Sequence, residues 1–137
     1  MKTITLQLLT LVRLQSLWRA ALVLSVVAIL YLATTSSPYP IPAAPIDKVN
    51  HLLAFLELTL LVQLGWPHGR RLPALLALAG YGLLIELIQG QLEHRDFSAA
   101  DMLADAAGIG LGLLLWPVLA RLQAYAIRQE RHLRNPP

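Results

Sequence analysis

Long apolar runs alternate with short polar stretches along this chain, and four of the runs predict helices. They cover residues 18–34, 49–66, 72–89 and 99–119. A helix needs about 20 mostly apolar residues to cross a bilayer. The second and fourth runs carry polar residues near their starts and are therefore the weaker candidates. The pattern predicts an all-α protein, a bundle of four transmembrane helices.

The segments on either side of these runs have patterns of their own. Residues 1–17 mix Thr, Gln and Arg with Leu, Ile and Val at roughly helical spacing, which is typical of a short amphipathic helix in the membrane interface. The alternative to an uncleaved anchor at the first run is a cleaved signal peptide. We expect the anchor, because the charged region of such a signal peptide would be unusually long, reaching Arg19, and no Ala-x-Ala cleavage site follows the apolar run. Four prolines predict a stiff, extended loop over residues 34–46. We expect an N-terminal segment at 1–17, a membrane domain at 18–119 and a basic tail at 120–137.

Composition supports a membrane protein and excludes several other classes. Of the 137 residues, 56% are hydrophobic and 14% are charged, whereas a soluble domain carries roughly 25% charged residues. This excludes a soluble globular protein, a disordered chain and a nucleic-acid-binding domain. The absence of Cys excludes disulfide scaffolds, thiol catalysis and Cys-ligated metal.

The basic residues predict the orientation. With four spans, both termini and the second loop share one side, which holds all of the eleven Lys and Arg residues except Lys48 and Arg95. Basic residues concentrate on the cytoplasmic side of membrane proteins, and Trp residues anchor at the interface. Trp18, Trp66 and Trp116 would all lie at the cytoplasmic interface. We expect a multi-pass protein of the bacterial cytoplasmic (inner) membrane with both termini in the cytoplasm.

The acidic residues gather at the other, outer end. Seven of the eight lie between Asp47 and Asp105. Two stripes at helical spacing carry several of them together with small residues; one is Gly82, Glu86 and Gln89, and the other is Asp101, Asp105, Gly108 and Gly112. A charged residue at bilayer depth costs about 2.5–3.5 kcal/mol, so these side chains should face protein or water.

We therefore predict one polar cluster at the outer leaflet, built from three helices and a loop. Structural interpretations compete with a functional one. Asp47 fits a helix N-cap, Ser98 and Asp101 match a capping box, and the glycines Gly82, Gly108 and Gly112 fit helix packing. The candidate functional residues are Asp47, Lys48, His51, Glu86, Gln89, Arg95, Ser98, Asp101 and Asp105.

The catalytic motifs that we looked for are absent. The chain has no P-loop, no G-x-S-x-G, no H-E-x-x-H and no dinucleotide-binding fingerprint. An acid-rich site with one His suits a hard divalent cation, but no ligand spacing is diagnostic. We therefore predict no cofactor and assign no metal site.

Several motifs occur together in a fixed order. They are Asp47-Lys48-x-x-His51, Glu86-x-x-Gln89, Arg95-x-Phe97-Ser98-x-x-Asp101 and the stripe from Asp101 to Gly112, which together cover about residues 40–115. In this combination the chain resembles the VanZ-like family of small bacterial integral membrane proteins. The resemblance implies a membrane protein of the cell envelope and a link to resistance to the glycopeptide teicoplanin. The chain departs from the family at Asp105, where Asn is common, and at Glu57, where an apolar residue is common.

Three hypotheses for function follow. In the first, the outer polar pocket binds a lipid headgroup or a lipid-linked envelope precursor without catalysis, with Arg95 contacting an anionic headgroup. In the second, the protein is a small intramembrane enzyme acting on a lipid-linked substrate, with Glu86 or His51 as general base and a divalent ion on the Asp pair. In the third, Glu57 and Glu86 serve a proton-coupled transporter built as a homo-oligomer. Membrane lipids are the expected partners and nucleic acid is not; the basic tail would attract anionic lipid.

Overall fold

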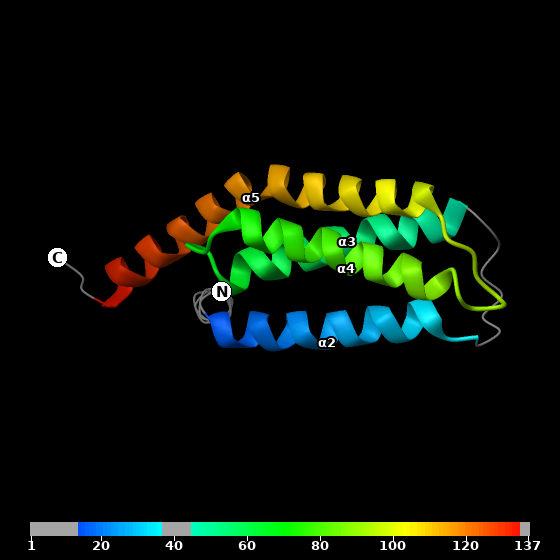
Figure 1. The fold of residues 1–137 in the computed structure, drawn as a ribbon. Coiled ribbons are helices and arrows are strands. Elements are labelled where there is room, and N and C mark those ends of the chain that lie inside the picture. Colours follow the sequence, from blue (N-terminus) through cyan, green and yellow to red (C-terminus); the bar gives the residue numbers. More distant parts are fainter. Residues whose placement is uncertain (1–13, 37–44, 135–137) are drawn as a thin grey trace.

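The computed structural model describes residues 14–36 and 45–134, and all regular structure in these ranges is helical. Figure 1 shows the helices lying alongside one another as an elongated bundle. They are α2 (Gln15–Thr34), α3 (Pro45–Gly65), α4 (Arg71–Gln89) and α5 (Ala99–Arg134). The predicted all-α class is confirmed for this part of the chain. The predicted amphipathic helix at residues 1–17 lies almost entirely outside the described residues.

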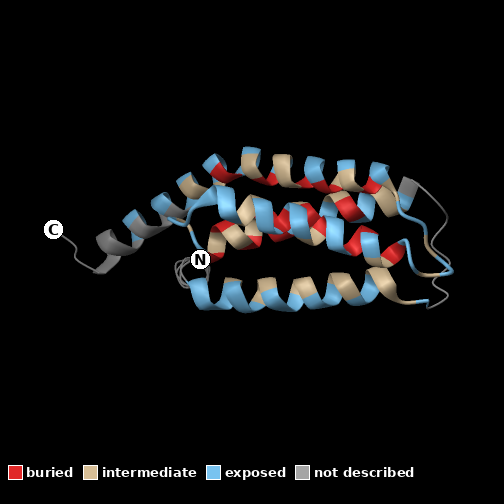
Figure 2. Ribbon diagram, viewed as in Figure 1, coloured by how far each residue is buried: buried red, intermediate tan, exposed pale blue. Residues whose placement is uncertain are grey.

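The central helix is α3. It packs most extensively against α5 and next against α2. The apolar core joins Phe55 and Leu58 of α3 to Leu78 and Ile85 of α4. By contrast, no residue of α2 is buried, so α2 covers the bundle from outside (Figure 2).

Within the described residues, three helices are long and apolar enough to cross a membrane: α2, α4 and the Ala99–Leu122 part of α5. Their outward faces carry large apolar side chains such as Leu24, Leu76 and Leu114, which are 70%, 64% and 74% exposed. So much exposed apolar surface suits contact with lipid and indicates a membrane protein. The predicted span at residues 49–66 lies in α3, which is more polar and is not among these three helices. Neighbouring helices cover its buried polar residues His51, Thr59 and Gln63.

The last helix extends past the predicted end of the membrane domain. Helix α5 continues without a break through Pro117 to Arg134, and Figure 1 shows it leaving the bundle. Proline removes one helical hydrogen bond and often bends a helix, but here the helix continues on the far side. The first part of the predicted basic tail is therefore a helical extension, on which Arg121 and Arg128 are exposed.

Glycines allow α5 to approach α3 closely. A Cβ atom built on Gly108 would contact the Leu52 carbonyl oxygen and would lie 2.9 Å from the Leu56 nitrogen. At Gly112 a Cβ atom would lie 2.7 Å from the Thr59 side chain. Any larger residue at these two positions would therefore push the two helices apart.

This packing predicts a position-specific effect on stability. Replacing Gly108→Val should lower the free energy of unfolding by about 1–3 kcal/mol, because the new side chain meets backbone that cannot move aside. Unfolding by SDS in mixed micelles measures the change. The matched control is Gly110→Val, since a Cβ atom at Gly110 meets nothing within 4 Å. Equal losses in the two variants would contradict the close-packing argument.

Candidate functional site

Polar side chains of α3, α4 and α5 meet where α3 begins and α4 ends. The buried ionisable residues among them are His51, Glu86, Asp101 and Asp105, each no more than 8% exposed. We call these four, together with Asp47, Lys48, Arg95 and Ser98 around them, the polar cluster. Such a concentration of buried carboxyl groups requires hydrogen bonds or opposite charges from the protein or from a ligand.

His51 lies between two carboxyl groups. Its Nδ1 is 2.9 Å from Asp105 Oδ1 on α5, and its Nε2 is 3.9 Å from Glu86 Oε1 on α4. A ring protonated on both nitrogens would direct one N–H group toward each carboxylate. His51 therefore connects the three helices through their charged groups.

Glu86 is fully buried and holds the start of α5. Its Oε2 accepts a hydrogen bond of 2.8 Å from the backbone N–H of Ser98. Ser98 Oγ in turn accepts a hydrogen bond from the N–H of Asp101, at 3.3 Å, and so caps α5. The predicted capping box is thus wrong in one half, because Glu86 takes the Ser98 N–H that Asp101 would bind. This arrangement leaves the Asp101 carboxylate available to other groups.

Two cations lie at the edge of the cluster. Lys48 Nζ is 3.5 Å from Asp101 Oδ1, and Arg95 Nη1 is 3.4 Å from Asp47 Oδ2. Asp47 was predicted to be an N-cap, but α3 begins at Pro45, whose fixed φ angle suits the first position of a helix. Asp47 therefore lies within the first turn, where a carboxylate interacts favourably with the helix dipole.

The structure gives unexpected surroundings to three residues that the sequence analysis singled out, which are Gln89, Gly82 and Glu57. Gln89 is buried but donates to the Ala33 carbonyl oxygen of α2, at 2.9 Å, and so stands apart from the cluster. Gly82 gives room to a carboxylate, since a Cβ atom there would lie 2.6 Å from Asp105 Oδ2. Glu57 is exposed, and its Oε1 accepts a hydrogen bond of 2.8 Å from the Ser25 hydroxyl.

Several acceptor atoms inside the cluster have no hydrogen-bond donor within the described residues. They are Asp105 Oδ2, Glu86 Oε1, which lies 3.9 Å from His51 Nε2, and Asp101 Oδ1, which has the ion pair with Lys48. A buried acceptor without a donor costs about 1–3 kcal/mol. A ligand that carries N–H or O–H groups, or a cation, would remove this cost.

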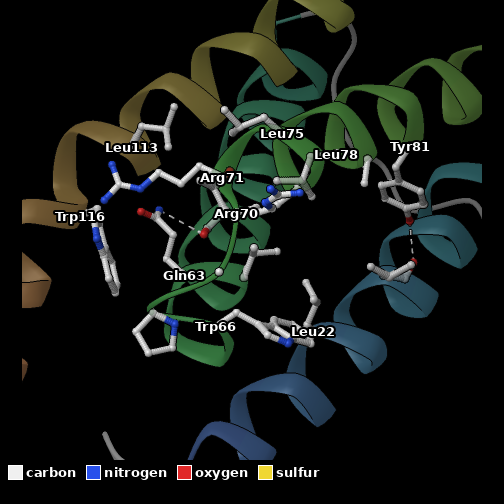
Figure 3. A pocket seen from close by; sticks show the side chains of 17 residues that line it. Leu22, Gln63, Trp66, Arg70, Arg71, Leu75, Leu78, Tyr81, Leu113 and Trp116 are labelled. Carbon is white, nitrogen blue, oxygen red and sulfur yellow. Dashed lines mark hydrogen bonds between the residues drawn. The ribbon is translucent and has the colours of Figure 1, made fainter.

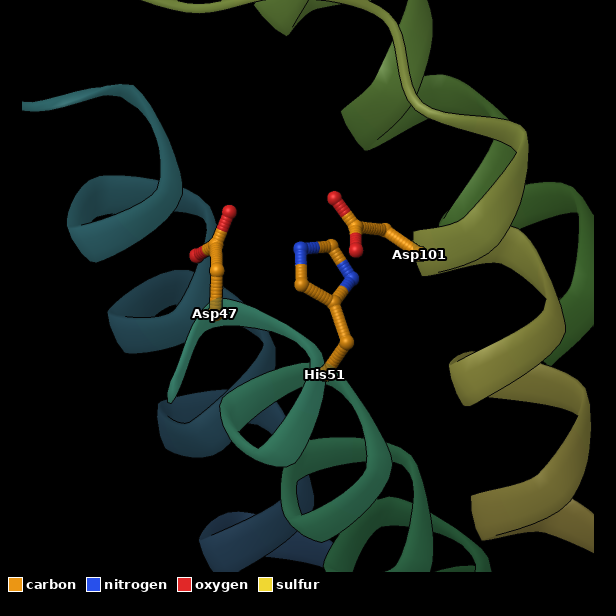
Figure 4. Close-up of side chains that lie close together, drawn as sticks. All are labelled: Asp47, His51 and Asp101. Atoms are coloured by element: carbon orange, nitrogen blue, oxygen red, sulfur yellow. The ribbon is translucent and has the colours of Figure 1, made fainter. Parts of the chain in front are cut away.

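The same end of the bundle also offers a set of ligands for a metal ion. Ligand atoms of Asp47, His51 and Asp101 all lie within 4.8 Å of one another, and Figure 4 shows both carboxylates beside the imidazole ring. Because Asp105 occupies Nδ1, Nε2 is the ring nitrogen left for a metal, and a carboxylate behind a ligating His is a common support. The enzyme hypothesis drawn from the sequence, which assigned no firm metal site, put a divalent ion on the Asp pair instead. The i, i+4 spacing of Asp47 and His51 is the signal that could have identified this set.

Fold and site together define an all-helical membrane protein with a buried, acid-rich polar cluster at one end of its bundle. The chain belongs to the VanZ/LLP1 family, whose family model matches residues 2–120. This confirms the resemblance found from the sequence motifs. The comparison with curated proteins gives no match, and neither does the comparison with solved structures.

The buried pair of His51 and Asp105 should contribute coupling energy. A double-mutant cycle of His51→Ala and Asp105→Ala should give roughly 1–3 kcal/mol, since contacting buried residues are coupled on this scale. The same cycle for Arg95→Ala and Asp47→Ala is the control and should give about 0–1 kcal/mol, because that pair is partly exposed. SDS unfolding measures both. A coupling energy for the buried pair no larger than that of the control would disprove the assignment.

Proposed function

We propose that this protein spans the bacterial cytoplasmic membrane four times, with both termini in the cytoplasm and the polar cluster at the outer leaflet. The orientation follows from the distribution of basic residues along the sequence. The central position of α3 supports a fourth span, because protein covers its polar residues His51, Thr59 and Gln63 and the exposed Glu57 accepts a hydrogen bond from Ser25 of α2. The chain would then consist of a membrane domain at 18–119, an N-terminal amphipathic segment and a helical basic tail.

We further propose that the polar cluster recognises the headgroup of a lipid or of a lipid-linked envelope precursor. The observation that carries this proposal is the set of buried carboxylate oxygens without donors, which lies beside two cations at the edge of the bundle. A headgroup with both a phosphate and hydrogen-bond donors matches this arrangement. Phosphoethanolamine and phosphate-linked sugars both have that chemistry.

Each part of the cluster has a role in this binding. Arg95 and Lys48 would contact the phosphate, since their present partners, Asp47 and Asp101, are 3.4–3.5 Å away. Glu86 and Asp105 would accept N–H or O–H groups of the ligand. His51 keeps these carboxylates in place. A role in glycopeptide or envelope-stress resistance would act through the envelope precursor that the site holds.

Glu86→Gln tests the acceptor role with little change of shape, because the amide oxygen can still accept from Ser98 N–H. We expect about tenfold weaker retention of phosphatidylethanolamine, since a hydrogen bond to a charged group contributes about 1.5–3 kcal/mol. Arg95→Ala should weaken retention as well, through the lost phosphate contact. Native mass spectrometry of the purified protein measures both.

Two controls make the test specific. Glu93→Gln changes an exposed acid in the α4–α5 loop and should leave retention unchanged. Phosphatidylcholine has no N–H donor, so its retention should not depend on Glu86. Unchanged retention of phosphatidylethanolamine in both site variants would refute headgroup binding at this cluster.

The metal-compatible geometry favours a second candidate, an intramembrane enzyme acting on a lipid-linked substrate. A divalent cation on Asp47, His51 and Asp101 would polarise a phosphate or generate a nucleophilic water, and Glu86 is placed to accept a proton. This candidate accounts for the three neighbouring ligand atoms of Asp47, His51 and Asp101, which headgroup binding alone does not require.

Metal binding separates the two candidates. The enzyme hypothesis predicts that the protein binds about one Mn²⁺. Asp101→Asn should lower the affinity for Mn²⁺ at least tenfold, because a charged ligand is lost. Electron paramagnetic resonance of free Mn²⁺ measures this directly. The control is Asp96→Asn, an exposed acid of the neighbouring loop. Absence of Mn²⁺ binding, or equal binding in both variants, would eliminate this candidate.

A further inference from the structure

A cavity of about 430 Å³ lies at the other end of the bundle, where α3 ends and α4 begins. Figure 3 shows it surrounded by side chains, and all four helices contribute to its lining. Most of the lining is apolar, including Leu22, Leu75, Leu78 and Leu113. Its volume falls within the roughly 300–1,000 Å³ of small-molecule sites. We call it the basic cavity.

Two adjacent arginines line the basic cavity, and no acidic residue does. Arg70 and Arg71 are both exposed, and neither side chain forms a hydrogen bond or ion pair with the described residues. Guanidinium groups bind phosphate in a bidentate manner. The two unpaired charges therefore favour an anionic group at this place.

The start of α4 adds to this preference. The helix begins at Arg71, and its N-cap residue Arg70 forms no side-chain capping hydrogen bond. The first N–H groups of a helix lack partners within the helix and carry partial positive charge. An anion beside Arg70 and Arg71 would meet these groups as well.

A buried acceptor inside the cavity also lacks a donor. Gln63 is 8% exposed, and its Nε2 donates to the carbonyl oxygens of Thr59 and Gly112, at 3.2 and 3.1 Å. These two bonds leave Oε1 buried with no donor in the described part of the chain. A ligand with a hydroxyl group would supply that donor.

We propose that the basic cavity binds an anionic phospholipid. The phosphate lies at Arg70, Arg71 and the start of α4, a hydroxyl group of the lipid donates to Gln63 Oε1, and an acyl chain lies among the leucines. A soluble anion would match the arginines but would leave the apolar lining unfilled. This site is separate from the polar cluster at the opposite end of the bundle. The proposal of lipid binding here therefore does not depend on headgroup binding at the polar cluster.

The test compares two lipids with the same acyl chains on the full-length protein in detergent. By native mass spectrometry, phosphatidylglycerol should be retained more strongly than phosphatidylcholine. The double variant Arg70→Gln/Arg71→Gln should lower retention of phosphatidylglycerol roughly 30-fold, at ~1 kcal/mol per basic residue. The matched control is Arg121→Gln/Arg128→Gln, which removes two exposed arginines of the basic tail outside the cavity. It should lower retention of phosphatidylglycerol far less than the cavity variant does, because the tail attracts anionic lipid at a surface but does not enclose it.

A second variant tests the apolar part of the site. Ala74 lines the cavity, and Ala74→Trp should weaken retention of both lipids by filling the space of an acyl chain. Thermal unfolding without lipid checks that each variant is folded, and the single arginine variants replace the double one if it is not. Two results would overturn the proposal: equal retention of phosphatidylglycerol by the wild type and the double arginine variant, or equal thermal protection by glycerol phosphate and phosphatidylglycerol.

Discussion

The close approach of α5 to α3 is the constraint on which the rest of this structure depends. It is possible because Gly108 and Gly112 present no side chain where α5 meets the backbone and Thr59 of α3. With the helices this close, His51 on one reaches Asp105 on the other at 2.9 Å. If the two helices were farther apart, His51 and Asp105 would each be buried without the other as a partner. An unpaired charge in a low-dielectric interior strongly destabilises the folded protein.

The buried acids are only partly compensated by the protein. Glu86 binds the Ser98 N–H through one oxygen, and Asp105 binds His51 through one oxygen, while the other oxygen of each has no hydrogen-bond donor in the described residues. A cluster built only for stability would satisfy both oxygens, since a half-satisfied polar network is less favourable than an apolar core. The open acceptors therefore argue for a ligand, as a headgroup or as a cation.

The two ends of the bundle have opposite chemistry. Buried carboxylates gather where α3 begins, whereas two exposed arginines without side-chain partners among the described residues lie where α4 begins. Under the proposed orientation, the arginines of the cavity face the cytoplasmic leaflet, where anionic lipids attract basic groups. In that orientation the chain would offer each leaflet a different polar site, and the apolar core that includes Phe55 and Leu58 lies between the two sites.

The sequence by itself determined the helices, the membrane class, the family and the residues that share a face, because apolar length and the helical period of 3.6 are local properties. It also named all eight residues of the polar cluster, together with Gln89, which stands apart from it. Only the tertiary structure decided which face meets which helix: Glu86 meets Ser98 N–H, Gln89 turns to α2, and Asp47 joins His51 near Asp101. The basic cavity was not predicted for the same reason, since its lining comes from four helices whose spacing along the chain says nothing of their distance in space.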